Sequence, residues 1–318
     1  MKWLRRYIAA CYNGKMTGCR YLRRLEKKGT GRMLEVICTV FFILVIIGVW
    51  IILYDTHHFV VRRYQFSSEK IKKTTRMVML SDLHNYRYGR ENCELLAAID
   101  AAAPDMIVIA GDMITACKKE KFDHTLRFLK ALRDKYPLYY AYGNHEQKIE
   151  LYEAVYGDMG ERFAKGLHDA GIEPLRNAHV TLPDRGIAIY GLEPERAYFQ
   201  RFTKKTMEDS YLEGLLGKRN EACYTVLLAH NPDYFPEYAA WGADLVLAGH
   251  VHGGIVRVPF LGGLISPALR LFPKYDGGLY TEGASQMALG RGIGTHSPKV
   301  RLLNPAELLV IELYGAGG

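Results

Sequence analysis

The chain has 318 residues, of which 49% are hydrophobic and 24% charged, with a formal net charge of +8. The length exceeds one average domain and fits one α/β domain with an additional segment. The excess charge lies in a basic tail, residues 1–32, where ten Lys or Arg accompany the single acid Glu26. The other residues are together nearly neutral, so we expect the tail to meet an anionic membrane surface and expect no nucleic-acid partner.

A long apolar segment follows the tail. Residues 36–54 carry no charge, and as a helix they would cover about 28 Å of a hydrocarbon core about 30 Å thick. We therefore predict a single transmembrane helix at residues 33–54, rather than a buried core helix or a cleaved signal peptide. The preceding basic residues predict a cytoplasmic N-terminus and a body outside the cell membrane; a cytoplasmic body on the inner leaflet is the alternative.

Apolar strand-like runs then alternate with helical patterns. Residues 55–76 are expected to form a polar, basic linker, and residues 77–318 the catalytic domain. The strands are expected at residues 77–80, 106–110, 138–142, 179–182, 187–190, 224–229, 245–248 and 307–313. Helices are expected at residues 94–103, 122–135 and 147–170, and an inserted helical flap at 195–220. This order predicts parallel strand pairing and the α/β class.

Short polar motifs follow five of the expected strands. They are SDLH at Ser81, GDM at Gly111, GNHE at Gly143, AHNP at Ala229 and GHVHGG at Gly249. In open α/β sheets the loops beyond the strand C-termini gather the active site, so we expect the acids, amide and histidines of these motifs to lie together. Each motif alone is a weak signal, but their order after predicted strands indicates a metal site.

These side chains suit two divalent metal ions about 3.5 to 4 Å apart. Asp112 is expected to bridge the ions, because a carboxylate offers two oxygens and a negative charge that offsets the repulsion between them. The other expected ligands are Asp82, His84 and His252 for the first ion, and Asn144, His230 and His250 for the second. Such a pair would lower the pKa of a bridging water and produce a hydroxide that attacks phosphorus.

His145 lies next to the expected ligand Asn144 in the sequence. We predict that it is the general acid for the leaving oxygen, or a hydrogen-bond donor to the phosphoryl oxygens in the transition state. Glu146 is expected to orient it.

The six cysteines show no CxxC or zinc-ribbon spacing. Three of them, Cys93, Cys117 and Cys223, lie in the expected catalytic domain, and an odd number cannot all pair. We expect them to be small buried apolar side chains rather than a disulfide framework.

The five motifs together resemble the calcineurin-like metallophosphoesterase superfamily over residues 77–315, and most of all its membrane-associated, YkuE-like phosphohydrolase branch. The resemblance implies a four-layer α/β sandwich with two mixed β-sheets flanked by helices. It also implies a pair of manganese, iron, zinc or cobalt ions, the same seven ligands, and His145 as the catalytic histidine. Val251 and Ile255 depart from residues frequent in the family, and neither is an expected ligand.

We therefore expect a membrane-anchored phosphohydrolase that cleaves a phosphodiester or pyrophosphate bond, with Asp112 and His145 as catalytic residues and a lipid-linked or envelope substrate. The sequence GDMITAC lacks the Asp-Arg-Gly of protein phosphatases, and Thr115 stands where purple acid phosphatases have Tyr. His145 and Glu146 lack the second His of the HExxH motif of zinc proteases. The alternatives are a phosphomonoesterase acting on small phosphates and a metal-binding scaffold without catalysis.

Overall fold

The computed structural model describes residues 18–118, 121–200, 204–254, 256–258, 260–265, 271–295 and 299–316. The chain divides into two compact units, Met1–Ile51 and Ile52–Gly318. The first unit holds most of helix α2 (Gly18–His57), and the expected basic tail before residue 18 lies outside the described residues. One segment of the described chain, Met33–His57, is long and apolar enough to cross a membrane, and its large apolar side chains are mostly exposed. This segment contains the predicted transmembrane helix.

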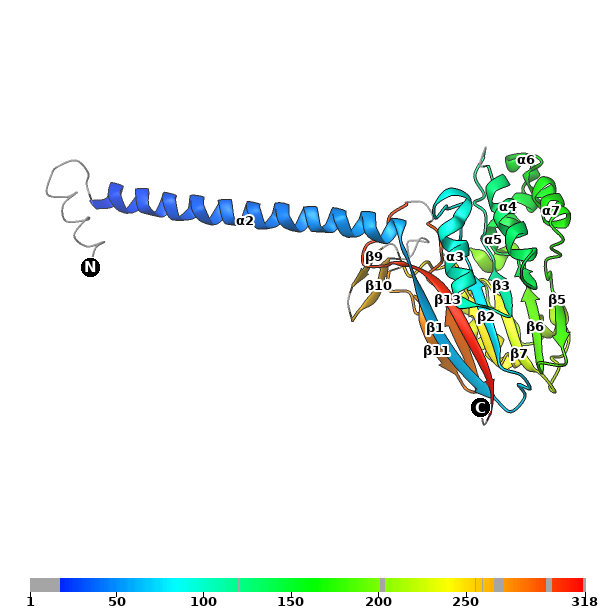
Figure 1. Cartoon of the computed structure of the whole chain (residues 1–318). Helices are drawn as coiled ribbons and strands as arrows, with labels where there is room; N and C mark the ends of the chain where they lie inside the picture. The colour runs from blue at the N-terminus through cyan, green and yellow to red at the C-terminus, as the bar shows by residue number, and fades with distance from the viewer. Residues whose placement is uncertain are drawn as a thin grey trace. The chain divides into compact units, whose positions relative to one another are not determined.

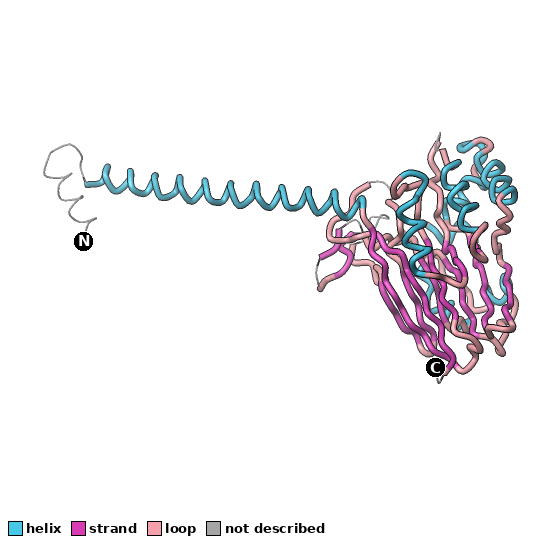
Figure 2. The backbone as a smooth tube through the Cα atoms, in the orientation of Figure 1, coloured by secondary structure: helices cyan, strands magenta, loops and turns pink. Residues whose placement is uncertain are grey.

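Two mixed β-sheets form the centre of the second unit (Figures 1 and 2). The first sheet has the order β1 (Phe59–Ser68), β13 (Ala306–Gly315), β2 (Thr75–Leu80), β3 (Met106–Ala110) and β4 (Leu138–Ala141). Only the pair β13 and β2 is antiparallel in this sheet.

The second sheet has antiparallel strands at both edges and parallel strands between them. Its order is β11 (Gly278–Glu282), β12 (Ser285–Leu289), β8 (Leu245–Ala248), β7 (Tyr224–Ala229), β6 (Ile187–Leu192) and β5 (Ala178–Leu182). A separate antiparallel hairpin is formed by β9 (Val256–Val258) and β10 (Gly262–Ile265).

Helices cover the outer faces of both sheets. Those on the first sheet are η1 (Arg90–Asn92), α3 (Cys93–Ala102), α4 (Asp123–Arg133), α5 (Asn144–Leu151), α6 (Glu153–Tyr156) and α7 (Met159–Asp169). Those beside the second sheet are η2 (Arg196–Phe199), α8 (Tyr211–Leu216), η3 (Pro232–Tyr234) and α9 (Phe235–Trp241).

Alternation along the strands explains the layers. In β2, Met77 and Met79 pack against the second sheet, whereas Val78 and Leu80 pack under the helices of the first. Successive side chains of a strand point to opposite faces, so each fully apolar strand contributes to two cores. The result is helix, sheet, sheet, helix, which confirms the predicted four-layer sandwich with two mixed sheets.

The linker expected at residues 55–76 is wrong as a description of this segment, because β1 lies within it and pairs with β13 over ten residues. The strand was hidden by its basic residues. Arg62 is paired with Glu307 of β13, and Arg63 with Glu312. β1 is an edge strand, where charged side chains are common because one side of the strand faces water.

The C-terminal turn of α2 belongs to the packed body rather than to a linker. The backbone N–H of Asn304 donates to Asp55 Oδ2 at 2.9 Å, and the hydroxyl of Tyr86 donates to the Thr56 carbonyl at 2.7 Å. Asp55 and Thr56 are both buried. The compact unit that contains the body therefore begins near Ile52.

Glycines contribute to the other differences between the expected and the observed elements. The helix expected at 147–170 is divided into three, with Gly157 in a left-handed conformation before α7. Among its described residues, the flap expected at 195–220 contains the helices η2 and α8, and α8 ends at Leu216, before Gly217 with its positive φ of 71°. The strands β11 and β12 were not predicted, since glycine, serine and threonine dilute their apolar pattern.

The cysteine prediction is partly wrong. Cys223 is buried, as expected, but Cys93 and Cys117 are exposed. All three are free thiols in the structure.

Candidate metal centre

The seven expected ligands lie in the segments that directly follow β2, β3, β4, β7 and β8, at the carboxyl ends of these strands. The structure brings their donor atoms together in three overlapping groups within 4.8 Å. The groups are Asp82, His84 and His252; His84, Asp112 and His145; and Asp112, His230 and His250. The remaining expected ligand, Asn144, is the first residue of α5 and lines the same cleft as Asp112.

Asp112 lies at the centre of the cluster. Its Oδ2 is 3.0 Å from His230 Nε2 and 3.9 Å from His84 Nε2. Its Oδ1 accepts a hydrogen bond of 2.7 Å from the backbone N–H of His145, which fixes the carboxylate plane. One oxygen is thus anchored to the backbone while the other faces both groups of histidines, the arrangement that a bridging ligand requires.

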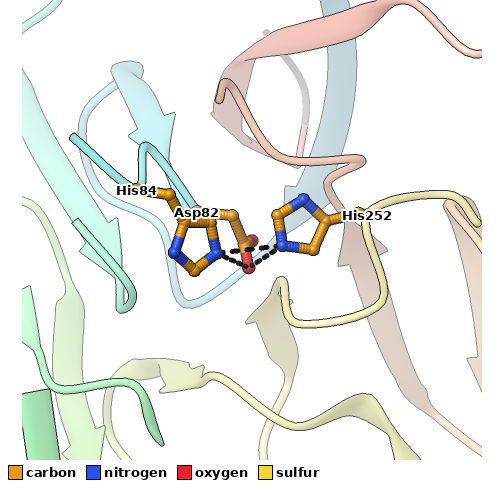
Figure 3. Close-up of side chains that lie close together, drawn as sticks. All are labelled: Asp82, His84 and His252. Carbon is orange, nitrogen blue, oxygen red and sulfur yellow. Dashed lines mark hydrogen bonds and ion pairs between the residues drawn. The ribbon is translucent and has the colours of Figure 1, made fainter. Parts of the chain in front are cut away.

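Figure 3 shows Asp82, His84 and His252 converging on one point. The Nε2 of His252 is 3.2 Å from Asp82 Oδ1 and 3.0 Å from the Nε2 of His84. Between two neutral imidazole nitrogens at this distance only one can supply a proton. Two ring nitrogens and a carboxylate oxygen directed at one another form a donor set suited to a divalent cation.

The residues on the other side also fit a metal ion. Asn144 Oδ1 is buried without a hydrogen-bond partner among the described residues, and such an orphaned acceptor costs about 1 to 3 kcal/mol unless a ligand satisfies it. His230 Nδ1 lies 2.6 Å from the carbonyl of Ala110. A carbonyl can only accept, so Nδ1 carries the proton and Nε2 is left to bind a cation.

The two carboxylates are held in their charged form. Burial opposes ionisation of both, but the neighbouring histidines outweigh it and hold the pKa values of Asp82 and Asp112 below the usual range. Because both acids stay ionised at neutral pH, the site offers two negative charges to a cation.

The histidines divide between two states. Burial and the adjacent His230 lower the pKa of His250 to about 3, and burial also lowers the pKa of His84. Burial likewise opposes the charge of His230, but Asp112 and Asp82 outweigh it and raise the pKa of His230 to about 10. Without a metal, a protonated His230 therefore carries the positive charge that compensates the carboxylates. A bound metal ion would supply this charge instead.

The backbone around the ligands is strained. Five of the seven adopt positive φ angles of 49° to 73°, namely Asp82, His84, Asp112, His250 and His252. Such angles are uncommon for residues other than glycine and concentrate at functional sites. Gly111 and Gly143 allow the strand loops to cross, since a Cβ on Gly111 would collide with the Gly143 backbone and one on Gly143 with Asp112.

Glu146 holds two of these loops together. Its carboxylate accepts hydrogen bonds of 2.7 to 2.9 Å from the backbone N–H groups of Asp112, Met113 and Gly143 and from the hydroxyl of Tyr140. Burial and the nearby Asp112 raise the pKa of Glu146 to about 7. The expectation that Glu146 orients His145 is not met by any of these hydrogen bonds, which hold the Asp112 loop against the Asn144 loop instead.

His145 is oriented by the backbone. The N–H of Ala116 donates to its Nδ1 at 2.7 Å, so this nitrogen is the acceptor and the proton of the neutral ring lies on Nε2. That Nε2 is 3.9 Å from Asp112 Oδ2 and faces the cleft. The ring can therefore present a proton to a group bound beside Asp112.

The cluster lies at the base of a cleft of about 840 Å³. Four basic side chains that the sequence motifs did not identify also line it: Lys148, Arg196, Lys204 and Lys274. Arg196 donates to the carbonyl of the expected ligand Asn144 at 3.4 Å. The positive charge around a carboxylate and histidine cluster favours an anionic substrate.

Comparison with known proteins agrees with this geometry. The chain is 26% identical to the metallophosphoesterase YkuE of Bacillus subtilis over 249 residues, which are 75% of this chain and 78% of that one. It is 24% identical to the UDP-2,3-diacylglucosamine pyrophosphatase LpxG of Chlamydia muridarum, covering 74% of this chain and 83% of that one. It is 26% identical to the phosphodiesterase YaeI of Escherichia coli, covering 75% and 82%.

Residues 75–254 match the calcineurin-like phosphoesterase family, which is more than half of the chain. The match begins at β2 and ends just after His252, so it includes every expected ligand and His145. The resemblance inferred from the five motifs is confirmed. The chain belongs to the calcineurin-like phosphoesterase family, and it is a metal-dependent hydrolase of phosphoric ester bonds.

Proposed function

We propose that this enzyme is anchored in the cell membrane by α2 and cleaves a phosphodiester or pyrophosphate bond in a lipid-linked substrate. Two divalent ions, of manganese, iron, zinc or cobalt, would serve as cofactors. The observation that carries the proposal is the place of Asp112, whose Oδ2 lies within 3.9 Å of histidines from both groups. The proposed ligands are Asp82, His84, Asp112 and His252 for one ion, and Asp112, Asn144, His230 and His250 for the other.

When bound, a metal pair supplies a water of lowered pKa and charge that offsets the phosphate. The chain then has two further tasks, which are to hold the phosphate and to protonate the leaving oxygen. Lys148, Arg196 and Lys204 provide cations on the cleft wall for the phosphoryl oxygens. Arg196 is held beside the metal centre by its hydrogen bond to the Asn144 carbonyl, which suits it to a second phosphate or an ester oxygen.

His145 is suited to the proton transfer. Ala116 fixes its neutral tautomer with the proton on Nε2, on the side of the ring that faces Asp112 and the cleft. A bound ester whose leaving oxygen lay near this nitrogen would receive the proton as the bond to phosphorus broke. General acid catalysis of this kind contributes about 10² to 10⁴ in rate.

Two independent observations support the proposed substrate class. The relatives LpxG and YaeI are named as a pyrophosphatase acting on a diacylated sugar nucleotide and as a phosphodiesterase, which favours diphosphate or diester bonds and a lipid substrate. The segment Met33–His57 would keep the enzyme at a bilayer where such lipids reside. The basic residues before the span favour a cytoplasmic N-terminus and an extracytoplasmic body.

The test uses the full chain in detergent micelles, depleted of metal and supplied with Mn²⁺, acting on bis(4-nitrophenyl) phosphate and on 4-nitrophenyl phosphate. The diester is expected to be cleaved faster. Asp112→Asn and His145→Gln are each expected to lower kcat at least about 100-fold, the scale of a lost general acid or metal ligand. His168→Gln is the matched control, because His168 is exposed on α7 away from the cleft-lining residues.

Each other outcome has a distinct meaning. Faster cleavage of the monoester would replace the proposal with a phosphomonoesterase of small phosphates. Full turnover by both site variants would refute the mechanism. Metal binding without turnover of either ester, or of a lipid diphosphate, would favour the scaffold alternative.

A further inference from the structure

Four large apolar side chains lie exposed around the hairpin β9–β10 and the segment that follows it. Phe260, in the turn of the hairpin, is fully exposed, Leu261 is 70% exposed, Leu271 67% and Phe272 58%. Leu271 bridges to Ile265 of β10, and the Phe272 N–H donates to the Leu264 carbonyl at 3.0 Å. We call these four residues the apolar rim. Exposed apolar groups gathered in this way mark an interaction surface rather than ordinary surface.

The apolar rim adjoins the last turn of α2. Phe260 and Leu261 line a cavity of about 730 Å³ whose wall also includes Asp55. Asp55 is buried and fixed by its hydrogen bond from Asn304, within the packed body that begins at Ile52. It also lies within the candidate membrane span, which ends at His57. Chain connectivity alone therefore places this cavity at the level where the span leaves the bilayer.

The same segment borders the metal cleft. Leu271, Phe272 and Lys274 line the cleft that contains Asp112 and His145. Lys274 lines both the cleft and the cavity beside Asp55, and it is exposed. An apolar strip with an adjacent cation thus runs between the end of the membrane span and the site of hydrolysis. This combination suits a lipid, whose chains are apolar and whose phosphate is anionic.

We infer that the apolar rim dips into the bilayer interface, so that a lipid-linked phosphate ester reaches the metal cleft while its chains stay in the membrane. This inference rests on the proposed function for the membrane anchor and for the identity of the ester, but the contact of the rim with lipid can be measured without turnover. The occupant of the surface is the phospholipid bilayer. Aromatic and leucine side chains on a protruding turn are those that enter the headgroup and acyl boundary.

The experiment measures the contact without requiring turnover. A single cysteine at position 260 or 272, in the full chain with its native cysteines replaced by serine, is labelled with the fluorophore NBD. The chain is reconstituted in nanodiscs of phosphatidylcholine and phosphatidylglycerol, with or without doxyl-labelled lipid as a quencher. The control position is Leu151 at the end of α5, which has the same exposed fraction as Phe272, 58%. Figure 1 shows the neighbouring α6 on the side of the body away from β9 and β10.

Doxyl lipid is expected to lower the fluorescence at 260 and 272 at least about twofold and to leave position 151 nearly unchanged, as membrane insertion of the rim requires. Quenching at 260 and 272 no stronger than at 151 would overturn the inference. The apolar rim would then be a surface for a protein partner rather than for the bilayer. A wild-type enzyme that cleaves no ester would contradict the proposed function, yet would leave the quenching result intact.

A second measurement links the surface to the substrate. Phe260→Ser with Leu261→Ser is expected to lower kcat/KM for a long-chain lipid diester in nanodiscs about tenfold, because binding to the remote chains is lost. Leu151→Ser is the control for loss of an exposed apolar side chain and is expected to retain the wild-type value. Equal kcat/KM for the double variant and wild type would contradict delivery through the rim.

Discussion

Replacing Glu146 by glutamine removes the acceptor that joins the Asp112 loop to the Asn144 loop. The carboxylate is completely buried and accepts from three backbone N–H groups and from the Tyr140 hydroxyl at 2.7 to 2.9 Å. Glutamine keeps the size of the side chain but has one acceptor oxygen. Its NH₂ group would face at least two donors, leaving them buried and unpaired.

The magnitude follows from the bonds lost. A buried donor left without an acceptor costs about 1 to 3 kcal/mol, so two such donors cost about 2 to 6 kcal/mol. For a body of this size, about 2 °C of Tm is lost per kcal/mol, which predicts a fall of at least roughly 4 °C. Turnover is also expected to fall, because Asp112 and Asn144 would no longer be held in register.

The assay is thermal unfolding of the metal-loaded full chain in micelles, together with diester hydrolysis. The matched control is Glu150→Gln in the same helix α5, where the carboxylate pairs with the half-exposed Arg176 at 2.8 Å. A pair of this kind contributes about 0 to 1 kcal/mol, so Tm should barely change. If Glu146→Gln unfolded at the wild-type Tm with full turnover, the assigned role of Glu146 would be wrong.

Four further outcomes are expected. Asn304→Ala should weaken Mn²⁺ binding about 10- to 100-fold by calorimetry, because Asn304 holds the His252 backbone through a 2.7 Å hydrogen bond; unchanged affinity would contradict this. A fragment of residues 77–318 should aggregate on size-exclusion chromatography, whereas 52–318 should not, since the shorter one lacks β1 and Asp55. Chelation of the metals should lower Tm, since a ligand at 100 times its Kd stabilises by about 2.7 kcal/mol; an unchanged Tm would argue against bound metal. A reporter fused after Gly318 should be active outside the cytoplasm, and activity only inside would reverse the proposed orientation.

The order of strands and motifs could be predicted because each central strand is a continuous apolar run that stops at a polar loop. Runs such as Met106–Ala110 are buried on both faces, so they are apolar at every position and stand out from the polar loops that follow them. The edge strand β1 escaped detection because half of its surface faces water and carries arginine. Pairing partners that lie 245 residues away, as Arg62 and Glu307 do, leave no local pattern.

The candidate ligands were predictable because each polar motif directly follows an apolar run. The carboxyl ends of these five strands, which belong to two sheets, meet at the same end of the sandwich. The supporting residues were not predictable. Arg196 reaches the cleft from a segment without a motif, and only the fold brings it beside Asn144. Lys148 lies in α5 one turn after Asn144, but no motif marks it as part of the site. The carboxylate of Glu146 accepts from backbone N–H groups of a loop 33 and 34 residues earlier. The sequence instead suggested His145 as its partner, because His145 is its direct neighbour in the chain.

The metal content of the active enzyme tests the two-ion centre most directly. Full-length chain loaded with Mn²⁺ and freed of unbound metal would be measured by mass spectrometry of the metal and by protein concentration. The shared ligand Asp112 predicts about two ions per wild-type chain and a loss of at least one in Asp112→Asn, with Glu150→Gln unchanged. A fully active wild-type chain that holds a single ion, or an Asp112→Asn chain that retains two, would contradict the account.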